Sequence, residues 1–190
     1  MPACGSVTQN ITPECDNPMV AGVRDKLYLI NFDDLDSVTR DGANNLLITD
    51  VLLGSGKVAY THTGKNNSIN AKFALVKKDF AEVYEHTVTE LIFDNSPTVK
   101  EEIDGLPKGR FIAIVENSHR GDSGNSAFEI YGLDAGLVIS VHTRDAGDDA
   151  TQGAHSIELK SSAKSLEPHV PATFFDTSYA VTLAKVEALL

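Results

Sequence analysis

Apolar residues return at every second position in one short segment after another, and this period of two is the strongest constraint that the sequence places on the fold. Segment 68–78, SINAKFALVKK, sets Ile69, Ala71, Phe73 and Leu75 between polar residues. Successive side chains of a strand point to opposite faces, so such a row buries one face and leaves the other toward solvent. The chain is therefore expected to fold mainly as short β-strands.

Nine strands and one further extended segment follow from this pattern. Strands are predicted at 26–32, 45–53, 57–63, 68–78, 84–94, 109–117, 126–132, 136–143 and 154–162, and two prolines keep 166–175 extended. The apolar centre of 109–117 is expected to lie deep in the sheet. Gly54 and Gly56 predict a hairpin that joins 45–53 to 57–63. The acidic stretch 31–36 is interpreted as a solvated turn.

Two helices interrupt the strands. The first is predicted over 96–106, where Ser96 is a candidate N-cap and Pro97 takes the first helical position. Its apolar stripe is Val99, Ile103 and Leu106. The second is predicted over 176–190, after a polar cap region. Its apolar face is expected to consist of Tyr179, Leu183, Val186 and Leu190.

Together these elements predict a mainly β fold of the α+β type. Short, numerous strands favour a β-sandwich or a partly closed barrel, with one short central helix over an edge or face and a C-terminal helix. We expect an N-terminal arm at 1–25, a β-sandwich domain at 26–175 and the terminal helix at 176–190. Because the arm lacks periodicity, it is expected either to dock on a neighbouring molecule or to be disordered in a monomer.

The charge balance bears on partners. The chain carries 27 acidic and 16 basic side chains, a formal net charge of −11. A protein that wraps nucleic acid needs a basic surface, so that class is excluded. The negative charge is compatible with a protein surface along which DNA moves without binding. It is also compatible with a charge that serves only solubility. No apolar run approaches the roughly 20 residues of a membrane span, so no membrane partner is expected.

No cofactor or metal site is expected either. The two cysteines, Cys4 and Cys15, have no neighbouring cysteine or histidine at zinc-ligand spacing. They are interpreted as half-buried thiols or as a local disulfide. The N-terminal segment lacks the basic start and apolar stretch of a signal peptide, which predicts a product that is cytoplasmic or is assembled inside a cell.

Loop 118–126, SHRGDSGNS, contains two familiar signals. Gly121 to Gly124 matches the nucleophile segment of chymotrypsin-like proteases, with Ser123 as the nucleophile. The upstream histidines, His62 and His86, both sit in the middle of alternating strands, and the rest of the protease pattern is missing. The Arg-Gly-Asp tripeptide at 120–122 is an adhesion signal only in an exported protein. We therefore predict no enzyme activity and interpret this loop as a solvent-exposed turn.

A resemblance enters at AFEIYGLDAGL, residues 127–137. An aromatic-containing strand ends in glycine and turns quickly into a Gly-Leu that starts the next strand, at positions Phe128, Tyr131, Gly132, Gly136 and Leu137. This arrangement resembles a recurrent stretch of bacteriophage tail tube proteins, and the match is most specific over 108–140. Segments 3–34 and 71–88 look like parts of small virion proteins from phages of Bacteroidetes hosts.

The resemblance implies a virion structural protein. Copies would form stacked, six-fold (hexameric) rings of a tail tube, joined by sheet edges that pair between subunits. DNA would pass along an acidic lumen without specific binding, and the other partners would be neighbouring virion proteins. The protein would be assembled in the host cytoplasm and would reside in the virion. A capsid decoration protein, a head–tail connector protein and a non-viral binding module are the alternatives.

Self-assembly would use the arm, a hairpin at 54–68 and the aromatic–glycine stretch. The candidate residues are Cys4, Cys15, Gly54, Gly56, Lys57, Tyr60, Lys65, Phe128, Tyr131, Gly132, Gly136 and Leu137.

Overall fold

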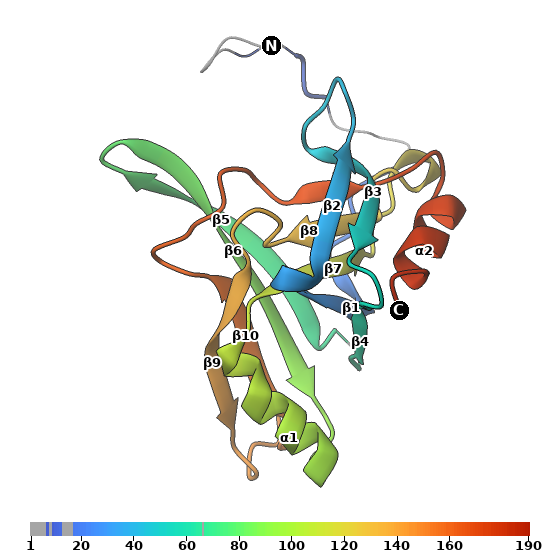
Figure 1. The fold of residues 1–190 in the computed structure, drawn as a ribbon. Helices are drawn as coiled ribbons and strands as arrows, with labels where there is room; N and C mark the ends of the chain where they lie inside the picture. Colours follow the sequence, from blue (N-terminus) through green and yellow to red (C-terminus); the bar gives the residue numbers. More distant parts are fainter. Residues whose placement is uncertain (1–6, 8, 13–16, 66) are drawn as a thin grey trace.

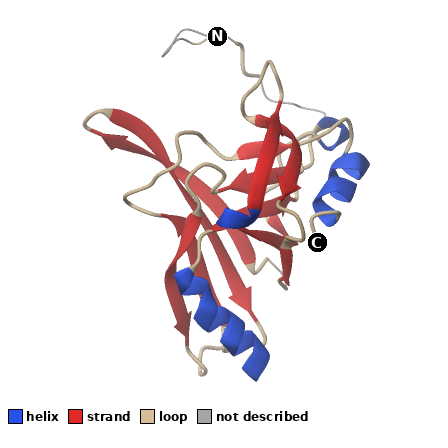
Figure 2. Ribbon diagram, viewed as in Figure 1, coloured by secondary structure: helices blue, strands red, loops and turns tan. Residues whose placement is uncertain are grey.

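A mixed sheet of eleven strands forms the body of the protein in its computed structural model, which describes residue 7 and residues 9–12, 17–65 and 67–190. The sheet is not closed into a barrel, and one central and one C-terminal α-helix accompany it (Figure 2). The prediction of a mainly β fold with two such helices is confirmed. Cys4 and Cys15 lie outside the described residues.

The strands follow the predicted order closely. They are β1 (Val23–Asn31), β2 (Leu35–Arg40), β3 (Leu47–Leu53), β4 (Tyr60–Thr63), β5 (Ile69–Lys78), β6 (Ala81–Ile92), β7 (Phe111–Asn117), β8 (Phe128–Tyr131), β9 (Leu137–Arg144), β10 (His155–Ser161) and β11 (Ala172–Phe174). Their order in the sheet is β2-β3-β11-β8-β7-β9-β10-β6-β5, and β1 pairs with both β4 and β7 (Figure 1). β1 starts inside the range predicted for the arm, because Val23 is buried.

Strand β7 is the centre of the fold. Its first six residues are all buried, as its apolar sequence predicts. Ile112 and Ile114 pack into one hydrophobic cluster, whereas Phe111, Ala113 and Val115 pack into a second. A strand covered on both faces has a continuous apolar sequence instead of an alternating one. The sheet therefore separates two cores.

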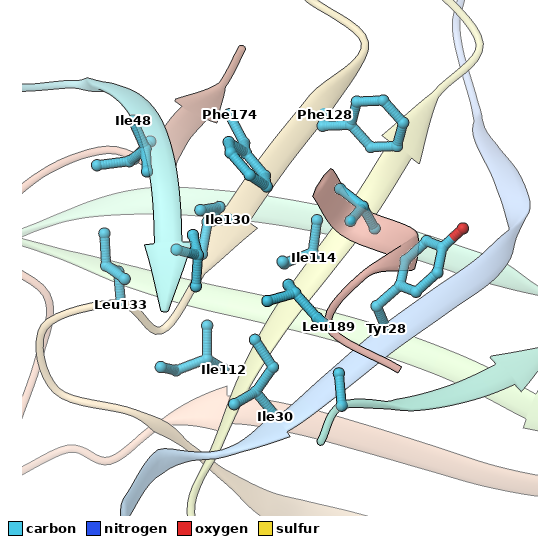
Figure 3. Packing of buried hydrophobic residues seen from close by; sticks show 14 of the residues in the cluster. Tyr28, Ile30, Ile48, Ile112, Ile114, Phe128, Ile130, Leu133, Phe174 and Leu189 are labelled. Atoms are coloured by element: carbon cyan, nitrogen blue, oxygen red, sulfur yellow. The ribbon is translucent and has the colours of Figure 1, made fainter. Parts of the chain in front are cut away.

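Each core is completed by one helix. The first core contains Val186 of the C-terminal helix and Leu189, which follows that helix. They belong to the same cluster as the aromatic residues Tyr28, Phe128 and Phe174 (Figure 3). The second contains Ile103 and Leu106 from the central helix. The helices thus stabilise opposite cores by removing apolar side chains from water, at about 25 cal/mol per Å² of buried apolar surface.

The central helix, α1 (Pro97–Gly105), begins as predicted. The Ser96 side chain accepts a hydrogen bond from the N–H of Val99, and Pro97 occupies the first turn. This cap satisfies one of the amide groups that have no partner within the helix.

The C-terminal helix, α2 (Tyr179–Glu187), begins with a similar cap from Ser178 to the N–H of Val181. The prediction that Leu190 faces the core was wrong. The helix ends at Glu187, so Leu190 does not follow the helical period; it is 51% exposed, and Leu189 is buried instead.

Two predictions around β2 and β3 were also wrong. The turn predicted over 31–36 is shorter, because a 3-10 helix spans Phe32–Asp34 and β2, which was not predicted, begins at Leu35 and pairs with β3. A turn does form at Gly54, whose carbonyl accepts a hydrogen bond from the N–H of Lys57. However, β4 does not pair with β3 and instead pairs with β1. Buried Ala59 donates its N–H to the carbonyl of Leu189, which directs the chain away from β3.

Candidate assembly surface

The most prominent surface feature is the long antiparallel hairpin formed by β5 and β6. Its register places Lys78 opposite Ala81, so only residues 79 and 80 make the turn. The tip of this hairpin projects from the body of the molecule (Figure 1). An isolated two-stranded ribbon gains little stability by itself, so its projecting part is suited to contact another molecule.

One face of the projecting hairpin is apolar. Phe73 lies opposite His86, and Leu75 lies opposite Tyr84. Phe73 and Leu75 each remain 49% exposed, and Phe80 at the turn is fully exposed. Contiguous exposed apolar side chains on a soluble protein are typical of an interaction site.

The period of two in 68–78 predicted a strand, but it did not predict that Phe73 and Leu75 would be exposed. The signal that could have identified it is the position of Phe80. A large aromatic residue that follows two lysines and an aspartate stands in a strongly polar stretch, which is unusual for a core residue.

The apolar face is continuous with the core through His86. The ring centroids of Phe73 and His86 are 6.5 Å apart, and those of His86 and buried Tyr131 are 5.5 Å apart. The two ring nitrogens of His86 contact the backbone. Nδ1 accepts the N–H of Gly132 at 3.2 Å, so the proton is on Nε2, which donates to the carbonyl of His169 at 3.0 Å. Burial lowers the pKa of His86 to about 4, against the effect of the hydrogen bond to His169.

Three strands of the sheet, β2, β4 and β5, each have a single partner strand among the described residues. β2 and β5 are the first and last strands of the sheet order, and neither has a second partner strand in the described part of the chain. Strand β5 bears Lys72, Lys77 and Lys78, whereas β2 bears one acid, Asp36, and one base, Arg40. An open edge offers unpaired N–H and C=O groups to another strand.

The predicted segment 54–68 does not form a hairpin, and its residues are dispersed. Lys57 Nζ lies 2.8 Å from Asp34 Oδ1, and this hydrogen bond raises the pKa of Lys57. Tyr60 is 53% exposed on β4, and Lys65 stands over the ring of Phe93. Gly54 and Gly56 belong to the turn before β4, where Gly56 has a φ of 73°. Of these residues, Tyr60 and Lys65 remain available at the surface.

The aromatic–glycine stretch is internal, which corrects its assignment to a contact surface. Phe128, Tyr131 and Leu137 are at most 3% exposed and pack within the cores. Gly132 and Gly136 close a tight turn in which the N–H of Gly136 donates to the carbonyl of Gly132. A side chain on Gly132 would meet the backbone oxygen of Phe111 at 3.0 Å. These five residues maintain the fold and provide no contact surface.

Buried Glu167 holds this turn from the far side. Its two carboxylate oxygens accept the N–H groups of Asp134 and Ala135, each at 3.0 Å. Burial raises the pKa of Glu167, although the hydrogen bonds from Ala135 and Asp134 oppose the rise. Glu167 also pairs through its backbone with Tyr84 of β6. Glu167 therefore connects this turn to Tyr84 of the hairpin.

The 118–126 loop is not the solvent-exposed turn that the sequence suggested. Arg120 donates to the carboxylate of Glu116 at 2.9 Å and to the hydroxyl of Tyr179 at 3.0 Å. Gly124 is buried, while Asp122 and Ser123 are exposed. The arginine of the Arg-Gly-Asp tripeptide is thus engaged within the protein.

The histidines considered as partners of Ser123 are engaged elsewhere. His86 contacts the backbone of Gly132 and His169, and His62 contacts Glu90. In the part of the chain that the structure describes, Ser123 has no hydrogen bond to either histidine. No group of three or more potential metal ligands comes together among these residues, and none of their helices is long and apolar enough to cross a membrane.

A small cavity lies between α1, β4 and β6. It has a volume of about 150 Å³. At its base, Nδ1 of His62 lies 2.9 and 3.0 Å from the two carboxylate oxygens of Glu90, which is 3% exposed. Burial lowers the pKa of His62, but the hydrogen bond to Glu90 and its charge outweigh this and leave the pKa raised.

Comparison with known proteins gave no match to any family model, curated protein or solved structure.

Proposed function

We propose that this protein is a virion structural subunit whose copies join into stacked six-fold rings of a bacteriophage tail tube. The observation that carries the proposal is the projecting β5–β6 hairpin, with its half-exposed apolar face and its open lysine-bearing edge. These features favour contact between copies of this chain.

The proposed contact is head-to-tail, because the hairpin of one copy meets a different surface of the next copy. Such contacts close into rings when the rotation between subunits permits, and otherwise continue as filaments.

The overall charge supports a conduit for DNA. With a net charge of −11, a ring of such subunits is strongly acidic. An acidic lumen repels phosphate groups, so DNA would pass without specific binding. The remaining partners would be further copies and other virion proteins, with assembly in the host cytoplasm and final residence in the virion.

Electron microscopy and sedimentation velocity over a range of concentrations test this proposal. We expect rings or tubes with a central hole for the unmodified protein. Leu75→Ser should shift the protein toward monomer, because it removes an apolar side chain from the hairpin face. Leu190→Ser is a matched control, since Leu190 is 51% exposed and Leu75 is 49% exposed.

Both variants must show an unchanged unfolding midpoint for the comparison to count. A monomer at every concentration would contradict self-assembly and favour a decoration protein or a binding module. Equal loss of assembly in both variants would contradict the assignment of the contact to the hairpin.

A further inference from the structure

The cavity between α1, β4 and β6 combines a buried anion with apolar walls. Val99, Ile103 and Leu106 form part of the wall, Glu90 lies at the base, and Glu102 is also among the lining residues. Among the described residues, the ring of His62 is the one hydrogen-bond donor to the Glu90 side chain. A carboxylate can accept about four hydrogen bonds, so Glu90 has unused acceptor capacity.

This combination fits a lysine side chain. The four-carbon stem of lysine packs on apolar surface, while its ammonium group carries three donors and a charge. His62 already pairs with Glu90, so the two carboxylates and this histidine leave one net negative charge at the cavity, which favours a cation over an anionic ligand. The ligand chemistry is therefore a primary ammonium group on an aliphatic stem.

The projecting hairpin presents such a group. Lys77 lies on the same face of β5 as Leu75, two positions apart, and its side chain is 75% exposed. Its nearest carboxylate, Glu82, is 4.0 Å away and 74% exposed, so this ion pair is weak and readily exchanged. Lys77 and the apolar face would thus reach a partner together.

A chain cannot place Lys77 in its own cavity. Lys77 lies opposite Glu82 in the hairpin, and Glu90 is eight residues farther along the same strand, β6. At about 3.4 Å per residue, roughly 27 Å separates the two positions. Figure 1 shows the hairpin tip and α1 at opposite ends of the molecule.

We propose that the cavity between α1, β4 and β6 receives Lys77 from a second copy of this chain. Its ammonium group binds Glu90 and Glu102, and its stem packs on the apolar wall. This inference rests on the proposed self-assembly and identifies where the hairpin docks. Because the donor and acceptor sites differ, the contact is head-to-tail and can propagate from copy to copy.

Cross-linking between isotopically distinct chains tests the contact directly. Full-length chains carrying ¹⁴N and ¹⁵N are mixed, and a carbodiimide joins touching amines and carboxylates without a spacer. Mass spectrometry should find Lys77 joined to Glu102 or Glu90 in peptides of mixed isotope content. The same mixture is examined by sedimentation velocity and by electron microscopy.

Charge reversal provides the second readout. Lys77→Glu and Glu102→Lys should each weaken association about tenfold, because each places like charges together at the contact. The double variant should recover to within about threefold of the unmodified protein. Lys164→Glu is the control, since Lys164 is exposed and lies outside both sites. Lys77 and Glu102 are also exposed, so all these variants are expected to fold.

The outcomes separate this inference from the proposed function. Rings or tubes without the mixed cross-link, and with normal assembly of Lys77→Glu, would overturn the docking site alone. The cross-link with charge-reversal rescue, but only dimers or open chains, would uphold the docking site and contradict the tail tube. Absence of both association and cross-link would overturn both.

Discussion

The guanidinium group of Arg120 stands over the aromatic ring of Tyr179, with its central carbon 4.0 Å from the ring centroid. Cation–π contacts of this kind contribute about 1 kcal/mol when partly shielded from water. The Tyr179 hydroxyl also donates to buried Glu116, at 2.8 Å. These contacts hold the 118–126 loop against α2. Arg120, the arginine of the Arg-Gly-Asp tripeptide, therefore stabilises the fold.

Arg120→Ala is expected to destabilise the protein by about 2 kcal/mol, because Glu116 is buried and would lose one of its charged partners. Arg24 and Tyr179 would remain in contact with Glu116, which limits the loss. Denaturant unfolding measures the change. Asp122→Ala, on an exposed neighbour, is the control and should change the free energy of unfolding by less than about 0.5 kcal/mol.

Gly124→Ala is expected to cost more than about 2 kcal/mol. Gly124 has a φ of +88°, and an added Cβ would lie 2.9 Å from the Cα of Tyr179. Gly56→Ala is a matched control, because Gly56 has a φ of +73° but nothing within 4 Å of an added Cβ. The control should therefore show the backbone cost alone, about 1 kcal/mol. Equal costs for the two variants, measured by denaturant unfolding, would contradict close packing of the loop on α2.

The order of strands and helices could be predicted from local pattern alone. β7 has a continuous apolar sequence, and α1 has a capping serine followed by proline, so both depend on neighbours in sequence. Pairing between strands is decided by contacts far apart in sequence. The turn at Gly54 looks like a hairpin signal, but whether β4 pairs with β3 depends on Ala59 and Leu189, which are 130 residues apart.

The candidate site was harder to predict because alternation does not distinguish a buried row from an exposed one. Ile69 and Phe73 belong to the same row of β5, yet Ile69 is buried and Phe73 is half exposed, because the hairpin extends beyond the core. The opposite error was made at Phe128 and Leu137. Their aromatic and apolar character was assigned to contacts between subunits, but the fold uses it for its own cores.

Removal of residues 1–20 is expected to leave the fold intact and to impair assembly. The remaining chain keeps the carbonyl of Gly22, which accepts the N–H of Ser118, and the pairing of Val23 with Asn117 in β1 and β7. The unfolding midpoint should therefore stay near that of the full chain, while sedimentation shows smaller species. Loss of cooperative unfolding in the truncated protein would contradict the assignment of an arm.

Acid should destabilise the protein through His86. Burial lowers the pKa of His86 from 6.5 to about 4 in the folded protein, so the unfolded chain binds a proton more readily between these values. Stability is expected to be complete above pH 6.5 and to fall by roughly 3 kcal/mol as the pH approaches 4. His86→Gln should have a flatter pH profile in denaturant unfolding. A wild-type profile parallel to that of the variant would show that His86 does not titrate in this way.

His62 should change the pH dependence of folding stability in the direction opposite to His86. Its pKa is raised above 6.5 in the folded protein, where Glu90 on β6 and Glu102 on α1 are the charged groups facing it. The folded state therefore binds the His62 proton more tightly than the unfolded chain. The stability that this pair contributes is fully present below pH 6.5 and is lost as the pH rises through the raised pKa. Unfolding free energies of the unmodified protein and of His62→Gln, measured from pH 6 to pH 9, isolate this contribution. The difference between them should shrink with rising pH, and a difference that is constant or grows would contradict an ion pair between His62 and Glu90.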